Sequence, residues 1–232
     1  MNVSAIPTCD YTWNPITGCR RGCKWCWARK VVKRFPKHYP NGFEPTFHPK
    51  RLSQPRRVRK PSLVFPCSMG DLLGDGVELQ WLDRVVKAMH EAEQHIFQVL
   101  TKWPRRLRMA SWPQGTWLGA TVPDAMFLDE ALIGLRQLGS HWYHTRYICF
   151  EPLAGPIGLP FGSLPFEWAI IGGWSGSRPT DPHVPEQQKW ASYLMSSLRN
   201  RGIPVYVKPN LHMPWAERGN AFPGGSTELV PR

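Results

Sequence analysis

Short apolar runs and longer amphipathic stretches alternate along the chain from about residue 62 onward. Runs bounded by turn residues predict buried strands at 62–68, 95–101, 116–122, 147–152, 168–173 and 203–209. Apolar residues at helical spacing predict helices at 78–94, 124–138 and 184–202, and Asp124 is a suitable N-cap for the second of them. A further short strand is predicted at 11–13.

The order strand, helix, strand, repeated with short connections, is typical of a parallel sheet covered by helices. About six or seven such strands fit into the chain, which is fewer than the eight of a closed barrel. We therefore predict an α/β fold, an incomplete (β/α) barrel of about six or seven parallel strands, in a single domain over residues 1–226. Residues 227–232 resemble a protease-cleaved tag remnant and are left out of the fold prediction.

Residues 29–60, which precede this pattern, form a basic arm. The arm is predicted to start as a short helix and to continue as an irregular segment broken by prolines. The arm contains eleven Lys and Arg residues and a single acid, Glu44, in a chain whose net charge is +12. Such a charge favours binding to nucleic acid through phosphate contacts, although a solvated surface loop is the alternative. The candidate nucleic-acid-binding residues, in the arm and beside it, are Arg20, Arg21, Lys30, Lys33, Arg34, Lys50, Arg51, Arg56, Arg57, Arg59, Lys60, Lys102, Arg105 and Arg106.

Three of the six cysteines, Cys19, Cys23 and Cys26, lie in "GCRRGCKWCWARK" with the spacing C-x3-C-x2-C. Neither a signal peptide nor a membrane span is recognisable, so we expect a cytoplasmic protein whose thiols stay reduced and bind metal. Three thiolates can hold three irons of a [4Fe-4S] cluster and leave one iron open. Cys9 is a possible fourth ligand. Zinc is the alternative metal, with His38 or His48 completing a tetrahedron.

The cysteine motif, with aromatic Trp25 just before its third cysteine, resembles the signature of the radical S-adenosylmethionine (radical SAM) superfamily. More narrowly, "TWNPITGC", "VFPCSMGDLLGD", "VLTKWPRRL", "FEPLAGPI" and "WAIIGGWSG" resemble a phage-associated family of radical-SAM-like proteins. Such relatives often have "GGESG" where this chain has "GGWSG", with Trp174 in place of the acid. The resemblance implies a [4Fe-4S] cluster and S-adenosylmethionine (AdoMet) as cofactors, and a 5′-deoxyadenosyl radical that abstracts a hydrogen atom from the substrate.

Polar residues follow several predicted strands, and in α/β barrels the carboxyl ends of the strands form the active site. By resemblance, Ser68, Gly70 and Asp71 are candidates for binding the methionine part of AdoMet, and Thr121 and Glu151 for binding its ribose. The resemblance also places Trp25, Gly172 and Gly173 near the adenine. Cys149 and Lys208 are candidate catalytic residues. Cys149 has the same strand parity as Glu151 and could donate a hydrogen atom, although ordinary packing is the alternative.

The leading functional hypothesis is a radical SAM enzyme, of isomerase, mutase or lyase type, that remodels a modified base in DNA. One example is phage DNA hypermodification by rearrangement, and another is repair of a lesion. A phage-encoded protein would act in the host cytoplasm. An electron donor such as flavodoxin or ferredoxin is the expected protein partner, and no membrane partner is expected. The alternatives are a radical SAM enzyme for a free nucleotide, a peptide or a small molecule, and a non-catalytic zinc-bearing protein that binds nucleic acid.

Overall fold

The computed structural model describes residues 1–139, 143–214 and 220–223, and its centre is one sheet of eight strands. Seven strands from β2 to β10 pair in parallel, and β1 adds an antiparallel edge beside β2. In spatial order the strands are β1 (Asn2–Val3), β2 (Tyr11–Trp13), β5 (Leu63–Pro66), β6 (Ile96–Thr101), β7 (Trp117–Thr121), β8 (Thr145–Phe150), β9 (Trp168–Ile171) and β10 (Val205–Val207).

This arrangement confirms the predicted α/β class and the mostly parallel sheet, while the partial-barrel form remains a prediction. Each predicted strand has its counterpart within a few residues, and β2 has the predicted bounds. The sequence reading missed β1 and the small antiparallel pair of β3 (Ile16–Thr17) with β4 (Thr46–Phe47). Strands of two residues are too short to show a period of two, so no pattern could reveal them.

The helices are α1 (Trp27–Arg34), α2 (Leu79–His90), α3 (Leu128–Arg136) and α4 (Val184–Arg199). Helices α2, α3 and α4 are each shorter than predicted, because turns follow or precede the helical residues. Asp124 caps a 3₁₀ turn at Ala125–Phe127 rather than α3 itself, accepting a hydrogen bond from the Met126 N–H at 2.9 Å. Among the described residues, no helix has both the length and the apolar character that crossing a bilayer requires.

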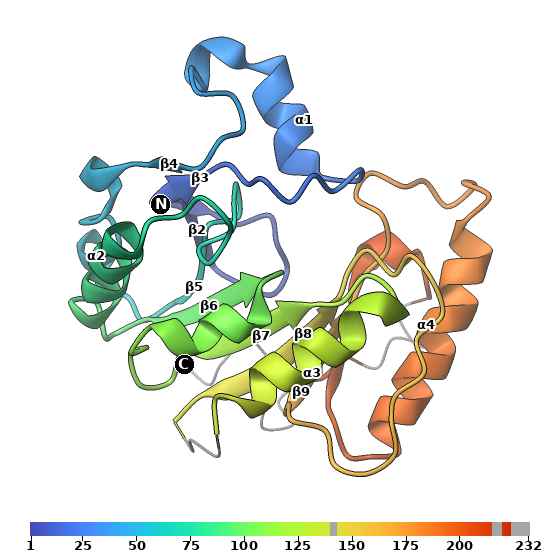
Figure 1. The fold of residues 1–232 in the computed structure, drawn as a ribbon. Helices are drawn as coiled ribbons and strands as arrows, with labels where there is room; N and C mark the ends of the chain where they lie inside the picture. The colour runs from blue at the N-terminus through green and yellow to red at the C-terminus, as the bar shows by residue number, and fades with distance from the viewer. Residues whose placement is uncertain (140–142, 215–219, 224–232) are drawn as a thin grey trace.

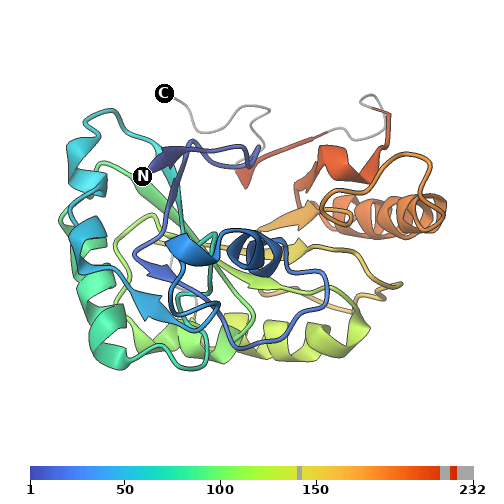
Figure 2. The ribbon, with the colours of Figure 1, turned by 90° about the horizontal axis from the view of Figure 1, so that it is seen from above.

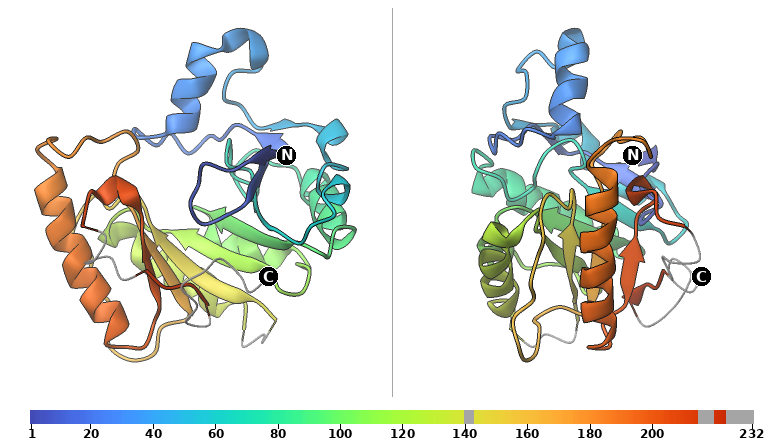
Figure 3. Two further views of the ribbon diagram at one scale, coloured as in Figure 1. Left: turned by 180° about the vertical axis from the view of Figure 1, so that it is seen from behind. Right: turned by 90° about the vertical axis from the view of Figure 1, so that its right-hand side faces the viewer.

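Helices α2, α3 and α4 surround the strands on the outside of the sheet, whereas α1 projects away from the rest of the fold (Figures 1 and 2). The views from behind and from the side show the same separation of α1 from the sheet (Figure 3). Consequently α1 offers most of its surface to solvent or to a partner, and only Ala28 and Val32 are buried.

The alternation of side chains along each strand divides the core into two clusters on opposite faces of the sheet. Ile148 and Phe150 of β8 belong to the larger cluster, which includes buried residues of α2, α3 and α4. Tyr147 and Cys149 of the same strand belong to the smaller cluster on the inner face. Gly119 leaves room for the Tyr147 side chain on the inner face, because a Cβ at position 119 would lie 2.3 Å from the Tyr147 ring. The inner face leads to the candidate site.

The basic arm, residues 29–60, starts with α1 as predicted. Its prolines then begin short 3₁₀ turns at Pro36–His38, Pro49–Arg51 and Pro55–Arg57, where the fixed proline φ suits a first helical position. The arm is anchored to the sheet by two hydrogen bonds near Arg51. The Trp13 indole donates to the Arg51 carbonyl at 2.8 Å, and the Arg51 guanidinium donates to the Asn14 carbonyl at 2.9 Å.

Candidate functional site

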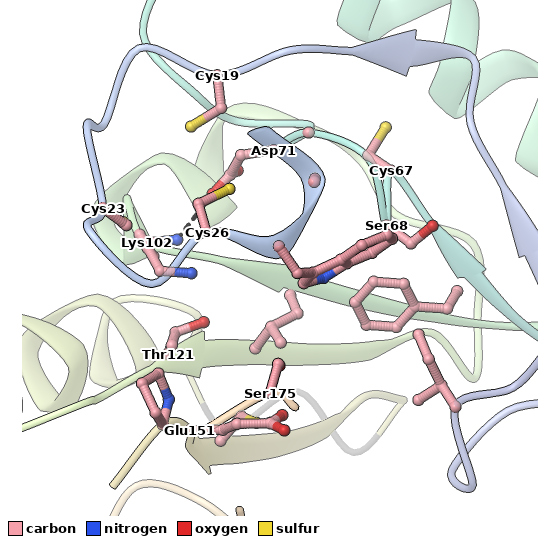
Figure 4. Close-up of a pocket in the computed structure, with 18 of the residues that line it drawn as sticks. Cys19, Cys23, Cys26, Cys67, Ser68, Asp71, Lys102, Thr121, Glu151 and Ser175 are labelled. Carbon is pink, nitrogen blue, oxygen red and sulfur yellow. Dashed lines mark hydrogen bonds between the residues drawn. The ribbon is translucent and has the colours of Figure 1, made fainter. Parts of the chain in front are cut away.

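A cavity of about 280 Å³ lies between the cysteine loop and the carboxyl ends of the parallel strands. This is close to the lower end of the usual range for small-molecule sites, roughly 300–1,000 Å³. Cys19, Cys23 and Cys26 lie along one side of it, and Thr121, Ser175 and Glu151 lie along the opposite side (Figure 4). The predicted site residues that line it are Cys19, Cys23, Trp25, Cys26, Ser68, Gly70, Asp71, Lys102, Thr121, Cys149, Glu151 and Lys208.

Backbone hydrogen bonds fix the shape of the cysteine loop. The Cys19 sulfur accepts the Arg21 N–H and the Cys26 sulfur accepts the Arg29 N–H, each at 3.4 Å, so Cys26 is also the N-cap of α1. The Arg29 guanidinium donates to the Cys19 carbonyl at 3.0 Å and lies over the Phe43 ring. Gly18, with φ of 87°, enters the loop where a Cβ would lie 2.1 Å from the Glu44 carbonyl oxygen. Only glycine fits that position.

The segment after β5 is tied to the strand that leads into the cysteine loop. The side-chain oxygen of Asn14 accepts the Met69 N–H at 2.8 Å, and the Asn14 amide also bonds Ser68. Gly70 bridges to Gly18, and a Cβ on Gly70 would lie 2.7 Å from the Gly18 oxygen. These contacts hold the segments "TWNPITGC" and "PCSMG" together, and the two segments form one wall of the cavity.

The carboxylate oxygens of Asp71 are already engaged in hydrogen bonds that hold this wall together. Its carboxylate accepts hydrogen bonds from the Thr101 hydroxyl at 2.8 Å, the Lys102 N–H at 2.9 Å and the Leu73 N–H at 3.0 Å. Burial raises the pKa of Asp71 above its usual range, and these hydrogen bonds oppose the shift. Asp71 therefore joins the end of β6 to the loop after β5, while its proposed contact with AdoMet remains a prediction.

The opposite wall carries an ion pair between Glu151 and Lys208. The Lys208 ammonium donates to one carboxylate oxygen of Glu151 at 2.5 Å, and the Asn210 amide donates to the other at 3.1 Å. The Cys149 thiol also points at this carboxylate, with a sulfur–oxygen distance of 3.7 Å. Both charged side chains are largely buried, with 14% of Lys208 and 20% of Glu151 exposed. Two predicted catalytic residues and one predicted ribose ligand thus form a single network.

Gly172 and Gly173 lie behind that network and do not line the cavity. A Cβ on Gly172 would lie 2.8 Å from the Glu151 carboxyl carbon, and one on Gly173 would lie 2.5 Å from the Asn210 oxygen. The glycines thus make room for the Glu151 network, a role that the sequence reading did not anticipate. Trp174, the departure from the usual acid, packs edge-on against Trp25 at a centroid distance of 5.8 Å.

The residues present fit an iron–sulfur cluster better than a single ion. Among the residues that the structure describes, no three His, Cys, Asp or Glu side chains converge as ligands of one metal ion do. A cubane cluster takes one thiolate for each iron, so its three ligands do not need to meet at one point. Cys9 does not line the cavity and pairs with the Ser4 hydroxyl at 3.0 Å, and His48 pairs with Thr17 at 2.8 Å.

Burial separates the cysteines by reactivity. It raises the pKa of Cys9 and Cys19 to about 11 and the pKa of Cys67 and Cys149 to about 12. Cys23 and Cys26 are half-buried, as is Cys19, whereas Cys9, Cys67 and Cys149 are buried. In cluster-free protein at neutral pH we therefore expect iodoacetamide to label Cys23 and Cys26 about tenfold or more faster than Cys9, Cys67 and Cys149, because the thiolate is the reactive form and burial disfavours it. Mass spectrometry of the peptides over time measures this order, and early labelling of Cys149 would contradict the described burial.

Sequence reasoning missed several residues of the site. Ser175 and Gln98 line the cavity, Asn210 holds Glu151, and Arg29 braces the cysteine loop. Gln98 had a visible signal, since it is a polar residue in the middle of the apolar run 95–101. Cys67 is notable for another reason: it lines the cavity with φ of 59°, a left-handed conformation that costs energy for a non-glycine residue.

The structure divides the candidate nucleic-acid-binding residues into two groups. Arg21, Arg51 and Arg106 are half-buried and donate to main-chain carbonyls, so they stabilise loops. Lys102 lines the cavity. The exposed group comprises Arg20, Lys30, Lys33, Arg34, Lys50, Arg56, Arg57, Arg59, Lys60 and Arg105. Within it Arg20, Arg56 and Arg105 pair with Glu44, Glu91 and Glu130.

A protein-family model described as Protein of unknown function (DUF5131) matches residues 3–218. No curated protein matches the chain. Among solved structures, a spore photoproduct lyase double mutant with bound AdoMet and dinucleoside spore photoproduct has a TM-score of 0.56 at 10% sequence identity. A single mutant with the dinucleoside spore photoproduct has a TM-score of 0.54 at 10% identity. Each alignment covers 89% of this chain and 57% of that one, so the chain spans little more than half the length of these lyases. At this identity the likeness is one of fold.

Proposed function

The chain belongs to the DUF5131 family of proteins of unknown function, so its activity is inferred here from the residues of the site. We propose that it is a radical SAM enzyme acting on a base in DNA. The observation that carries this proposal is a cavity lined both by the three-cysteine loop and by polar residues at the carboxyl ends of parallel strands. The fold shared with a lyase structure that holds AdoMet supports it.

Cys19, Cys23 and Cys26 would hold three irons of a [4Fe-4S] cluster, one thiolate for each iron. Metal binding requires these thiols to lose their protons, and burial opposes that loss most at Cys19. The N-terminus of α1 offsets part of this cost, since the Arg29 N–H already points at the Cys26 sulfur. Trp25 of this loop packs edge-on against Trp174.

When both cofactors are bound, they supply a 5′-deoxyadenosyl radical that abstracts a hydrogen atom from the substrate. The protein contributes binding, orientation and exclusion of water. Ser68 and Gly70 offer polar and backbone groups to the methionine part of AdoMet. The Thr121 hydroxyl is buried, lines the cavity and has no hydrogen-bond partner in the part of the chain that the structure describes, so it suits a ribose hydroxyl. Glu151 retains acceptor capacity beyond the bonds from Lys208 and Asn210.

Cys149 would return a hydrogen atom to a carbon radical on the substrate. Burial raises its thiol pKa to about 12, so the sulfur carries its hydrogen at neutral pH. The hydrogen atom leaves with one electron, and restoring the thiol takes one electron and one proton. Flavodoxin or ferredoxin is the proposed class of electron donor. Lys208 neutralises Glu151 beside this thiol and so keeps the carboxylate in place.

The DNA substrate is proposed on charge and on the nature of the structural neighbour. The arm that follows the cysteine loop carries exposed basic residues, and the net charge of the chain is +12. The lyase structures contain a dinucleoside spore photoproduct. A base in a duplex has to leave its stack to reach a cavity of this kind. Remodelling of a modified base, such as a rearrangement in phage DNA, and repair of a lesion are the two reactions proposed.

The decisive experiment incubates the anaerobically reconstituted, reduced protein with AdoMet, with and without DNA. The proposal expects 5′-deoxyadenosine in both cases and more of it with a competent DNA. Deuterium transfer from labelled DNA into 5′-deoxyadenosine would identify the attacked carbon. Faster turnover with free nucleotides or peptides than with any DNA would favour the alternative substrates. A colourless protein with one zinc and no iron would overturn the enzymatic proposal.

Helix α1 gives a direct test of the DNA contact. The triple variant Lys30→Ala, Lys33→Ala, Arg34→Ala removes three exposed charges, and we expect its binding to single-stranded DNA to lose a salt-dependence slope of about 2, at roughly 0.7 per phosphate contact. The matched control removes three exposed charges from the outer helices, as Lys87→Ala, Arg136→Ala and Lys189→Ala. Fluorescence anisotropy at several salt concentrations measures both. Equal slopes for the two triple variants would refute a specific role for α1.

A further inference from the structure

Gln98 lies deep in the cavity with an unusual lack of hydrogen bonds. It belongs to β6, lines the cavity and is 1% exposed. Within the described residues the oxygen of its side-chain amide has no hydrogen-bond partner, and the nitrogen has only the oxygen of the Tyr147 hydroxyl near it. Buried amides are almost always paired, and an unpaired one costs roughly 1–3 kcal/mol. An amide kept in this state is suited to a ligand.

The neighbours of Gln98 leave its amide oxygen without a donor. The Tyr147 hydroxyl lies beside the amide but donates its hydrogen to the Val99 carbonyl at 3.0 Å, so its oxygen can only accept from the amide nitrogen. The apolar residues that line the cavity on the inner face include Phe65, Leu100 and Ile170. The surroundings therefore favour a neutral, flat ligand and disfavour a charged one, because nothing there compensates a buried charge.

Gln98 is also separated from the cofactor end of the site. It is in register with Trp117 of β7, whereas Thr121, four residues farther along β7, is in register with Cys149. At about 3.3 Å per residue, this corresponds to roughly 13 Å along the strand. The charged lining residues Asp71, Lys102, Glu151 and Lys208 all lie at or beyond strand ends. The charged groups of the cavity thus lie at one end of the strands, and Gln98 lies away from them among mainly apolar side chains.

We infer that Gln98 is the specificity residue for the substrate, and that it binds the edge of a neutral heterocyclic base carrying an adjacent hydrogen-bond donor and acceptor. A carboxamide presents one donor and one acceptor side by side, and it pairs with such an edge through two hydrogen bonds. The phosphates then stay outside, near the basic arm. The inference rests on the proposed function and adds the substrate group that this site recognises.

The variant Gln98→Met tests the inference, since it keeps the length of the side chain and removes both polar atoms. The probes are thymidine, 2′-deoxycytidine, 2′-deoxyadenosine and 2′-deoxyguanosine, which carry no phosphate and avoid the basic arm. Calorimetric titration of the reconstituted full chain should find at least one that binds the wild type. We expect Gln98→Met, or methylation of that base on its pairing edge, to weaken binding about 30-fold, the equivalent of two net hydrogen bonds.

Thermal unfolding distinguishes recognition from a structural role. Since the amide oxygen is unpaired within the described residues and the amide is buried, Gln98→Met should unfold at about the same temperature as the wild type or higher. A lower unfolding temperature together with unchanged nucleoside binding would mean that Gln98 only stabilises the fold, and the inference would be wrong. It would equally be wrong if the wild type bound none of the four nucleosides. Formation of 5′-deoxyadenosine is measured separately. If the protein cleaves AdoMet but binds none of the nucleosides, the inference about Gln98 is wrong while the proposed radical chemistry stands.

Discussion

Replacing either Cys23 or Cys26 with Ala is expected to remove iron binding and 5′-deoxyadenosine formation together. Each thiolate would hold a different iron, so the loss of one leaves two ligands for a cluster that needs three from this loop. Activity should fall to the background of the assay. Iron and sulfide analysis and the absorbance of the reconstituted protein measure the loss of the cluster, and chromatography of 5′-deoxyadenosine measures the loss of activity.

Cys9→Ala is the matched control, because Cys9 is a free buried cysteine that lies outside the cavity. It should retain the full iron content and activity, with a modest loss of stability from the deleted sulfur. Retention of iron by Cys23→Ala or Cys26→Ala would contradict the cluster proposal. Loss of iron in Cys9→Ala would instead make Cys9 a fourth ligand and close the open coordination position that AdoMet needs.

The second large effect is expected from Lys208→Met, which leaves the buried carboxylate of Glu151 without its cation. Breaking one partner of a buried ion pair costs about 3–5 kcal/mol, and the remaining exposure of this pair favours the lower end, about 3 kcal/mol of unfolding free energy. Turnover with substrate should also fall by roughly 100-fold or more, because Glu151 and Cys149 lose their fixed geometry. Urea denaturation measures the first effect and product analysis the second.

The double variant Lys208→Met, Glu151→Gln separates stability from function. Removing both charges should restore most of the unfolding free energy, since no uncompensated charge remains. Turnover should stay low, because the variant lacks the ion pair beside the cavity. A double variant that recovers turnover along with stability would show that the pair serves the fold alone.

The sign of the pH dependence follows from the raised pKa of Lys208. Burial by itself lowers this pKa, but the charge and the hydrogen bond of the Glu151 carboxylate, together with Cys149 in its thiolate form, outweigh it. A raised pKa in the folded state means that the contribution to stability is complete below the unfolded lysine value of about 10.4 and is lost as the pH rises through the folded value. The stability difference between wild type and Lys208→Met should therefore be constant from about pH 7 to 9 and shrink only above about pH 10.4.

The sequence alone determined the α/β class, the order of the main strands and helices, and the three-cysteine loop. These depend on local patterns: periodic apolar positions, strand-ending polar residues and cysteine spacing. It could not determine that Asp71 uses its carboxylate to join two loops, or that Gly172 makes room for Glu151, because those contacts join residues far apart in the chain. The short strands β1, β3 and β4 were invisible for the same reason, since two residues become a strand only beside a partner.

The tertiary structure alone decided which polar residues face one cavity and which are consumed in holding it together. Arg21, Arg51 and Arg106 belong to the same basic composition as Lys30 and Lys33, yet they donate to main-chain carbonyls. In the sequence Gln98 is one polar residue in an apolar strand, and only its burial, with an amide oxygen that is unpaired within the described residues, indicates a ligand. Composition fixes the charge and the hydrogen-bonding groups that a chain possesses, whereas three-dimensional packing decides which of them remain free to meet a ligand.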